Sequence, residues 1–356
     1  MKKFFSMMIA AVLCLSVAMA VVGCSEDKSA SKTPTSVGAV YEIKKGDDNT
    51  EYAVLKQYTI SDEAAAKVAK NNYQDLMVDL VGENKINVYV DGDKTYPVKE
   101  IAASAFANQL VIRSIEFGEN VTTFGAACLS GCVNLEKLTV PFVGKSVDAV
   151  NDGKVLGYLF GTASVDGATS VTMSYNASGS KSFSIPDSLK EVTVTGTVLS
   201  EYAFYGLSLS KVNVENVQSI PNYAFYGMNE IVSYKIPAGV TSIGDYAFAS
   251  CANLTKIDFT AAAALTTIGD HAFDGCSMLG YGKNNPVVFP ASLTSLGEKA
   301  FYKCTELVAV DFSASGVTTI NEYTFYGCAK LATATLKDGT EVKTGAFEGC
   351  DLLNAE

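Results

Sequence analysis

The chain has 356 residues, of which 48% are hydrophobic and 18% charged, and its formal net charge is −11. This composition excludes a largely disordered protein, because enough apolar residues are present to form a core. The acidity opposes binding to nucleic acid or to anionic lipid surfaces. With one histidine, His271, and one arginine, Arg113, the chain also has little material for imidazole-based proton transfer.

The N-terminus has the features of an export signal. Two lysines precede an apolar run over residues 4–20 that only two serines interrupt. The run is followed by Val-Val-Gly-Cys at residues 21–24, which resembles the bacterial lipoprotein box. We therefore predict a signal peptide over residues 1–23, lipidation of Cys24 and membrane attachment through that lipid alone. The alternative is an uncleaved signal-anchor helix, although its apolar run is marginal for spanning about 30 Å.

The next two segments carry no repeat. Residues 24–38 are polar and rich in serine and threonine, which is typical of a mobile tether. Residues 39–97 contain β-like runs at 51–60 and 85–90 and a helical stretch at 62–71. Because a repeat array needs a cover for its first apolar face, we predict that residues 39–97 form an N-terminal cap region.

From Val98 onward a single pattern returns. An isoleucine is followed by Ala-Phe four residues later, then by cysteine three residues after the phenylalanine and leucine six after it, as between Val240 and Phe259. The aromatic position, called here the anchor, recurs mostly every 21 to 28 residues. Nine copies at such similar steps indicate repeats of one supersecondary unit rather than separate domains. The anchors are Phe106, Leu129, Phe204, Phe225, Phe248, Phe273, Phe301, Phe325 and Phe347.

Each copy ends in a leucine-rich-repeat strand, such as Leu254-x-x-Ile257-x-Phe259. Its alternating apolar residues would point inward, so each coil would add one strand to a parallel sheet. The sequence therefore predicts an α/β-type leucine-rich repeat solenoid over residues 98–141 and 188–356. It would have a parallel sheet on one face and short helical or irregular turns on the other. Nine strands about 4.8 Å apart would give a continuous sheet edge of roughly 40 to 45 Å.

These repeats resemble the BspA-like, or Treponema-type, leucine-rich repeat. That family has Ile-Gly-x-x-Ala-Phe-x-x-Cys and Leu-x-x-Ile-x-Ile-Pro elements, and Pro141, Pro237 and Pro290 stand at its proline position. The resemblance covers residues 98–353. It implies a surface or secreted protein of a host-associated microbe, and several members of the family are adhesins that bind extracellular-matrix proteins.

Six cysteines share one repeat position and should form a column inside the coil. Equivalent side chains of stacked coils run parallel, whereas a disulfide needs Cβ atoms about 3.8 Å apart and zinc needs four converging ligands. We therefore predict buried free thiols in the same core as the anchor phenylalanines, in preference to a disulfide ladder or a metal site. The six are Cys132, Cys251, Cys276, Cys304, Cys328 and Cys350.

A second column, three residues before the anchor, is acidic in most copies. We expect these carboxylates to cap short helical turns, where they would favour exposed amides and the helix dipole, with a calcium ladder as the alternative. They are Glu201, Asp245, Asp270, Glu298 and Glu322.

Two tyrosine columns flank the anchors and contribute to the candidate binding surface. Tyrosine supplies contact area with little entropy loss and is common at recognition surfaces, but these rings would equally well pack on one another between coils. His271 belongs to the first column, which we expect to face solvent, and no partner set accompanies it for catalysis. The surface also includes polar residues of the strand face. The set is Tyr202, Tyr205, Tyr223, Tyr226, Tyr246, Tyr302, Tyr323, Tyr326, Asn213, Lys235, Asp258 and Asp311.

Residues 142–187 interrupt the repeats. The piece at 156–161 suggests an irregular extra coil, and the runs at 171–175 and 182–185 predict a hairpin standing off the solenoid. Insertions of this kind often carry recognition.

Taken together, the sequence favours a non-catalytic, exported surface lipoprotein that adheres to or recognises an extracellular protein or glycan, without cofactor or metal. A second hypothesis is capture of glycans or peptides for a transporter. A third is an enzyme whose site lies in the insertion or the cap.

Overall fold

The computed structural model describes residues 37–60, 67–68, 77–282 and 285–353. The predicted signal peptide, Cys24 and nearly all of the predicted helix at 62–71 lie outside these residues. The first strand begins at Val37, so the last two residues of the predicted tether, 37 and 38, belong to a strand instead. Among the described residues, no helix is long and apolar enough to cross a bilayer.

The N-terminal cap is a small sheet that covers the first coil. Strands β1 (Val37–Lys45) and β2 (Glu51–Ile60) pair antiparallel, as do β4 (Val88–Asp91) and β5 (Lys94–Ile101). β2 and β5 are parallel neighbours. The predicted strand at 51–60 is therefore present, whereas the one expected at 85–90 begins only at residue 88, after the 3₁₀ helix η2 (Gly82–Asn84). The Tyr58 ring stacks on the first anchor, Phe106, at a centroid distance of 5.0 Å.

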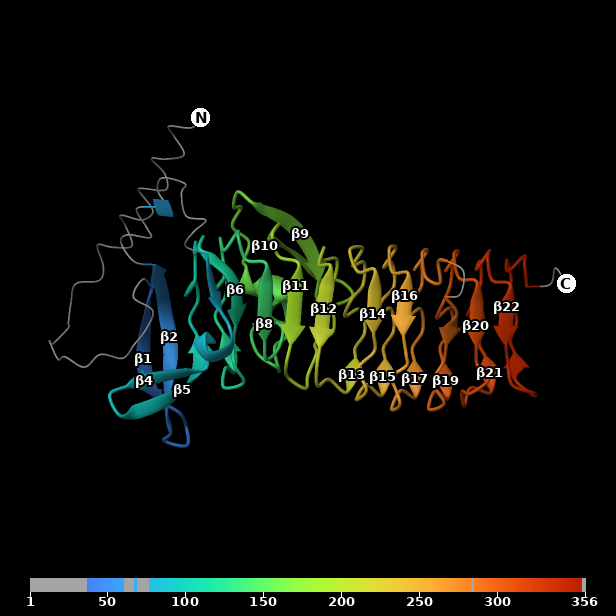
Figure 1. The fold of residues 1–356 in the computed structure, drawn as a ribbon, viewed down its shortest axis with the longest axis horizontal. Coiled ribbons are helices and arrows are strands. Elements are labelled where there is room, and N and C mark those ends of the chain that lie inside the picture. The colour runs from blue at the N-terminus through green and yellow to red at the C-terminus, as the bar shows by residue number, and fades with distance from the viewer. Residues whose placement is uncertain (1–36, 61–66, 69–76, 283–284, 354–356) are drawn as a thin grey trace, which may run out of the picture.

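Successive coils build two parallel columns of strands along the long axis of the molecule (Figure 1). The first column holds the leucine-rich-repeat strands: β3 (Val78–Leu80), β6 (Ile112–Glu116), β8 (Lys137–Val140), β11 (Glu191–Val194), β12 (Lys211–Val214), β14 (Ser233–Lys235), β16 (Lys256–Asp258), β18 (Val287–Val288), β20 (Ala309–Asp311) and β22 (Thr333–Thr335). The sequence predicted a parallel sheet, and every pair within this column is parallel, with Val192 opposite both Leu138 and Val212.

The second column was not predicted. It consists of two-residue strands at the start of the coils, β7 (Thr123–Phe124), β13 (Ser219–Ile220), β15 (Ser242–Ile243), β17 (Thr267–Ile268), β19 (Ser295–Leu296), β21 (Thr319–Ile320) and β23 (Glu341–Val342). β7 pairs with the end of β5, so the cap joins this column directly. These strands lie where the sequence was expected to form only helical or irregular turns.

The first column is also not a continuous ladder, contrary to prediction. It is divided into the sheets β3-β6-β8-β11-β12, β14-β16 and β18-β20-β22. The coils nevertheless remain stacked across the breaks, because other contacts hold them together.

The strongest of these contacts is a stack of anchor phenylalanines. Consecutive rings from Phe204 to Phe347 lie 4.9 to 5.5 Å apart between centroids and are close to parallel. The anchors up to Phe325 are buried, whereas Phe347, in the last coil, is only partly buried. A stack of this kind gives each coil apolar contacts with both neighbours, which is the source of stability in a solenoid.

The cysteine column runs beside the phenylalanines. All seven cysteines of the described residues are free and buried. The thiol of Cys251 donates to the carbonyl oxygen of Phe225 in the preceding coil, at 3.1 Å, and the other five members of the column make the same bond. Each cysteine is therefore both a small apolar residue and a donor that links two coils.

The acidic column acts differently from the prediction. The anchor turns contain no helix, so these residues cap none. Instead, Asp245 Oδ1 accepts the backbone N–H of Asp270 at 2.9 Å, and Asp270 Oδ1 accepts that of Glu298 at 2.8 Å. These two carboxylates satisfy amides of the following coil and so join coils laterally.

Glycines after the isoleucine allow the coil backbones to approach closely. A Cβ atom on Gly297 would lie 2.4 Å from the carbonyl carbon of Gly269 in the preceding coil, and a Cβ on Gly269 would lie 2.8 Å from the amide nitrogen of Asp245. Any side chain at these positions would separate the coils, which explains the Ile-Gly element of the repeat.

The segment at 142–187 is a coil with a hairpin inserted in it. The N–H of Leu129 bonds the carbonyl of Leu159, and the adjacent Phe160 is buried. The coil contains the 3₁₀ helices η3 (Asn151–Lys154) and η4 (Leu156–Leu159), then the antiparallel strands β9 (Ala168–Ser174) and β10 (Ser180–Pro186).

The hairpin does not stand off the solenoid, contrary to prediction. Met173, Phe183 and Ile185 are buried in the main core, and the hairpin lies along one edge of the molecule (Figure 1). Phe183 packs so closely on Gly157 that a Cβ there would come within 2.4 Å of its ring. The hairpin's apolar side chains thus extend the core.

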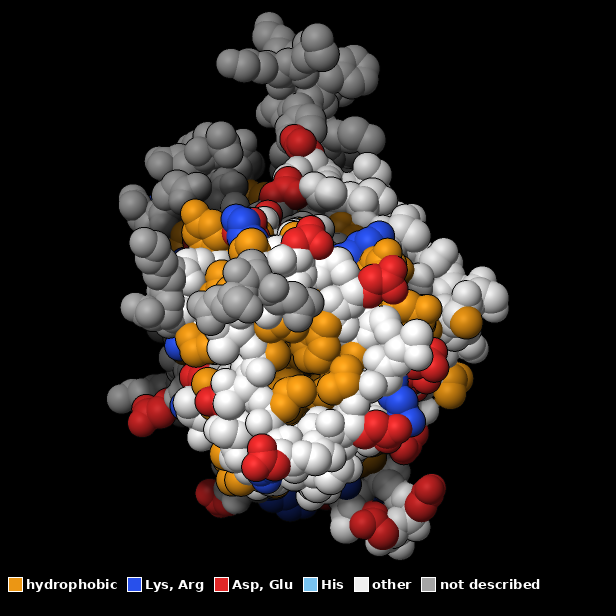
Figure 2. Space-filling view, turned by 90° about the vertical axis from the view of Figure 1, so that its right-hand side faces the viewer, with side chains coloured by type: hydrophobic (Ala, Val, Ile, Leu, Met, Phe, Trp, Pro, Cys, Tyr) orange, Lys and Arg blue, Asp and Glu red, His pale blue; other side chains and the backbone are white. Residues whose placement is uncertain are grey.

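The C-terminal end of the solenoid leaves part of the core open. Figure 2 looks onto this end and shows apolar side chains gathered in its middle, with charged side chains toward its margin. Phe347 and Leu353 are partly buried there against the core. The last coil therefore has a neighbour on one side only in the described structure.

Candidate functional site

The two tyrosine columns form stacks rather than open platforms. Tyr223 lies parallel to Tyr202 and Tyr246, with centroid distances of 4.7 and 4.9 Å, and Tyr246 stacks on His271 at 4.5 Å. In the second column, Tyr205 stacks on Tyr226 at 4.8 Å, as Tyr302 does on Tyr326 at 4.9 Å. Because their faces cover one another, most of these rings present only their edges and hydroxyl groups to a partner.

The first tyrosine column is less solvent-facing than we expected. Tyr202 is buried, and the Nζ of Lys154 lies 5.2 Å from its ring centroid. Desolvation raises the pKa of Tyr202, Tyr223 and Tyr246, with nearby acidic side chains adding to the effect. His271 is half-buried, and its Nδ1 lies 2.7 Å from Asp274 Oδ2. The column thus functions chiefly in packing.

The backbone of this column is left-handed whether or not the residue is aromatic, since Lys299 has a φ of 53°. Tyr202, Tyr223, Tyr246, His271 and Tyr323 all have φ between 54° and 60°, in the left-handed region that costs an L-residue roughly 1 to 2 kcal/mol. Each ring stack offsets part of that cost. Hydrogen bonds between coils offset more, since the N–H of Tyr223 bonds the carbonyl of Asp245 at 3.0 Å.

The outward face of the strands is polar and varied. Asn213 Nδ2 bonds Glu191 Oε1 at 3.2 Å and Thr193 Oγ1 at 3.3 Å, so it is held by its neighbours. Asp258 and Asp311 turn back to accept backbone N–H groups two residues ahead, at 2.9 and 2.8 Å. For Asp258, hydrogen bonds from Thr260 and the nearby lysines lower the pKa. Lys235 is exposed and has no ion-pair partner within the described residues.

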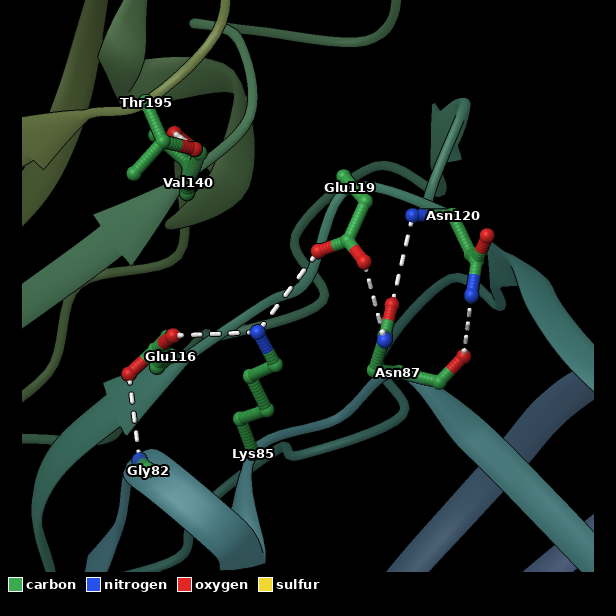
Figure 3. Close-up of polar contacts among 8 residues, drawn as sticks. All are labelled: Gly82, Lys85, Asn87, Glu116, Glu119, Asn120, Val140 and Thr195. Atoms are coloured by element: carbon green, nitrogen blue, oxygen red, sulfur yellow. Dashed lines mark hydrogen bonds and ion pairs between the residues drawn. The ribbon is translucent and has the colours of Figure 1, made fainter. Parts of the chain in front are cut away.

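At the cap end this face is occupied by a polar junction (Figure 3). Glu116 on β6 accepts the N–H of Gly82 at 3.1 Å and lies 3.7 Å from Lys85 Nζ. Lys85 also reaches Glu119 at 3.5 Å. Across the same junction, the backbone N–H of Asn120 donates to Asn87 Oδ1 and Asn120 Nδ2 donates to the backbone carbonyl oxygen of Asn87. Glu116 therefore holds the cap against the first coils and is not free to meet a partner.

A hollow on the strand face lies between β12 and β14. These strands do not pair, and Figure 1 shows a wider interval between their arrows than between β11 and β12. The coil that carries β12 is short: Phe225 follows Phe204 by 21 residues, the smallest step in the repeats. One residue fewer separates the anchor from the strand than in the next coil, and it is at this step that β12 and β14 fail to pair.

The two coils still touch on their other sides. The Phe204 and Phe225 rings lie 5.5 Å apart, and the N–H of Phe204 bonds the carbonyl of Ala224 at 2.9 Å. The opening is therefore confined to the strand face, where it forms a groove of about 650 Å³, within the range of about 300 to 1,000 Å³ typical of ligand sites.

The groove, called here the β12–β14 groove, has an unusual lining for so acidic a chain. It contains Lys211 and Lys235 but no carboxylate. A second hollow of about 530 Å³, on β3, β6, β8 and β11, is lined by charges of both signs that already pair, such as Arg113 with Asp79. Among the described residues, no cluster of three or more His, Cys, Asp or Glu side chains is arranged to hold a metal ion.

Comparison with known proteins identifies the repeats. A family model described as BspA type leucine rich repeat region matches six copies, over residues 94–151, 168–280 and 264–356. The chain belongs to this family. The match includes the hairpin residues, consistent with their place in a coil. No curated protein matches the chain.

Several solved structures are similar to this BspA-type chain. A leucine-rich repeat protein from Bacteroides ovatus is 22% identical with a TM-score of 0.42, and the alignment covers 88% of this chain and 79% of that one. A leucine-rich repeat protein from T. pallidum is 23% identical, with coverage of 54% and 90% and a TM-score of 0.34. A leucine-rich cell surface protein from Faecalibacterium prausnitzii is 20% identical, with coverage of 92% and 94% and a TM-score of 0.34.

The groove was missed at the sequence level, although a signal for it was present. The 21-residue step between Phe204 and Phe225 is apparent in the sequence, but no interruption of strand pairing was predicted from it. The structure brings Asn213 and Lys235, both predicted surface residues, to this groove. Asp258, Asp311 and the tyrosine columns are not among its lining residues.

Tyr234, beside the groove, offers a test of how the core is packed. Its ring lies 5.1 Å from both Phe225 and Phe248, and its buried hydroxyl has no hydrogen-bond partner. Tyr234→Phe is therefore expected to raise the free energy of unfolding by about 1 kcal/mol, because the desolvation cost of the hydroxyl disappears. Denaturant unfolding would measure this. Tyr226→Phe, at a half-buried position, is the control and should change stability little.

Proposed function

We propose that this protein is an exported, lipid-anchored surface protein that recognises an extracellular protein or glycan through its strand face, without catalysis. Membership of the BspA-type repeat family supports a binding role. The export signal over residues 1–23 and the lipoprotein-box cysteine Cys24 support attachment outside the cytosol.

The observation that carries the proposal is the contrast between the two sides of the strands. On β12, Val212 and Val214 are buried in the core of the solenoid, while Lys211 is exposed and Asn213 is half-buried on the outer side. The inner side is similar from coil to coil, whereas the outer side varies. Strands fixed by such a core hold their outer side chains in place before binding, which reduces the entropy cost of recognition.

The lipid attachment at Cys24 is tested by mass spectrometry of the mature protein isolated from its native cell envelope. A diacylglyceryl group on an N-terminal Cys24 is the expected result, and Cys24→Ser should release the chain from membranes. An unmodified Cys24 inside an uncleaved signal peptide would refute the lipid attachment but would leave the binding role open.

Recognition is tested with the full-length chain in detergent micelles, presented to arrays of matrix proteins, mucins and glycans. We expect saturable binding to at least one class. A variant with Asn213, Asp258 and Asp311 changed to alanine should bind more weakly, whereas Lys330→Ala, at an exposed position outside these strands, should bind normally. Absence of saturable binding on every array would contradict the proposal.

A further inference from the structure

The β12–β14 groove exposes main-chain groups that a continuous ladder would pair. The N–H groups of Lys211 and Glu215 bond carbonyls of the β11 coil, at 3.1 and 3.0 Å. In a parallel ladder alternate residues bond to opposite neighbours, so the main-chain groups of Val212 and Val214 are directed toward β14. No hydrogen bond of the described residues joins them to β14.

The facing edge of β14 is open in the same way. The carbonyl oxygen of Val232 accepts a hydrogen bond from a backbone N–H in the β16 coil, and the N–H of Ile236 donates to the backbone carbonyl oxygen of Asp258 at 2.9 Å. The intervening residues, Ser233 and Lys235, therefore direct their main-chain groups toward β12. Two unpaired strand edges thus face each other across one groove, and an open edge is a template for another extended chain.

Charge indicates which chain would fit. The two lysines border the groove from opposite strands, and no acidic side chain lines it. Lys211 Nζ contacts Glu191 Oε1 at 2.6 Å, whereas Lys235 has no partner within the described residues. Asp258, opposite Lys235 on β16, has turned to accept the N–H of Thr260. The groove is thus locally cationic in a chain of net charge −11.

We propose that the β12–β14 groove binds an acidic peptide segment in extended conformation, whose main chain pairs with the open strand edges while a carboxylate meets Lys235. This inference rests on the proposed recognition function and names the chemistry of a partner for it. Strand addition of this kind uses main-chain hydrogen bonds for affinity and alternate side chains for specificity.

The pattern of the groove favours a peptide over other anions. Successive side chains of an extended peptide point to opposite sides, so acidic residues at every second position would face the lysines on the outer side. The residues between them would face the apolar floor near Val214 and Ile236. A free phosphate or an acidic glycan would use the lysines but leave the strand edges unpaired.

The test uses the full-length chain in detergent micelles and a fluorescent peptide with the sequence Asp-Val-Asp-Val-Asp-Val, capped at both ends. Fluorescence anisotropy should show saturable binding. Lys235→Glu should weaken it by at least about tenfold, the effect of one charge-assisted hydrogen bond. Lys137→Glu is the control, because Lys137 also lies exposed on the outer side of a strand, β8, but within a closed ladder, and its binding should stay within about twofold of the wild type.

Two further probes separate strand pairing from simple charge attraction. The same peptide with alternate backbone nitrogens methylated should bind at least about tenfold more weakly, because it cannot donate those hydrogen bonds. Inorganic phosphate and hyaluronate should compete poorly. Equal binding of the methylated peptide, or equal competition by these anions, would overturn the peptide assignment, as would absence of binding at millimolar peptide.

The outcome of the peptide test can be distinguished from the outcome of the array test of the proposed function. If the arrays show saturable binding but the acidic peptide does not bind, the groove inference fails and surface recognition stands. If the peptide binds at the groove while every array is negative, the recognition proposal fails for those partners and the groove assignment stands.

Discussion

Phe248→Ala is expected to lower the free energy of unfolding by about 3 to 5 kcal/mol. Phe248 is fully buried between the rings of Phe225 and Phe273, at centroid distances of 4.9 and 5.3 Å, and a third ring, Tyr234, lies 5.1 Å away. Truncation leaves a cavity that the neighbouring coils cannot close, because hydrogen bonds and the glycine contacts fix their spacing. Denaturant unfolding followed by circular dichroism would measure the loss.

Phe347→Ala is the matched control. The repeat position is the same, but Phe347 is partly buried, and within the described residues its ring stacks only on Phe325, at 5.3 Å. Since stability in a solenoid is a sum over neighbouring coils, the terminal position should cost distinctly less than the central one. Equal losses at the two positions would mean that the ring stack does not carry the coupling between coils.

The repeats were predictable because one physical requirement recurs in every coil. A buried anchor, a small residue beside it and an alternating strand leave few alternatives, so the solenoid, the parallel strands and the inward cysteines followed from spacing. Features that depend on contacts with a neighbouring coil could not be predicted from residue spacing. Asp270 bonds an amide 28 residues away, and no local signal distinguishes that from a helix cap.

The candidate site was predictable only in part, for the same reason. Lys235 was assigned to the outer face from strand alternation. Its groove lies where β12 and β14 fail to pair, a break that is seen only once the strands of neighbouring coils are placed side by side. The hairpin was found from its own pattern, but its docking on the core depends on Gly157, which lies 26 residues before Phe183.

The column cysteines should be nearly inert at pH 8 in the native protein. Desolvation by burial raises the pKa of Cys132 and Cys251 to about 12. Since only the thiolate attacks, their reaction with a disulfide reagent should be about a thousandfold slower than that of a free cysteine of pKa about 8.5. In the last coil, the neighbouring Cys328 thiol lowers the pKa of Cys350, which should therefore react first. Fast modification of Cys251 without unfolding would contradict this.

The same burial makes stability depend on alkaline pH. Because the folded pKa is raised above the unfolded value of about 8.5, the contribution of each thiol is complete below about pH 8.5 and is lost as pH rises toward about 12. At pH 10 the loss is about 2 kcal/mol for each such thiol. With reductant present, the free energy of unfolding should fall less between pH 7 and pH 10 in Cys251→Ala than in the wild type. Equal falls would show that Cys251 ionises as readily in the folded chain as in the unfolded one, which its burial should prevent.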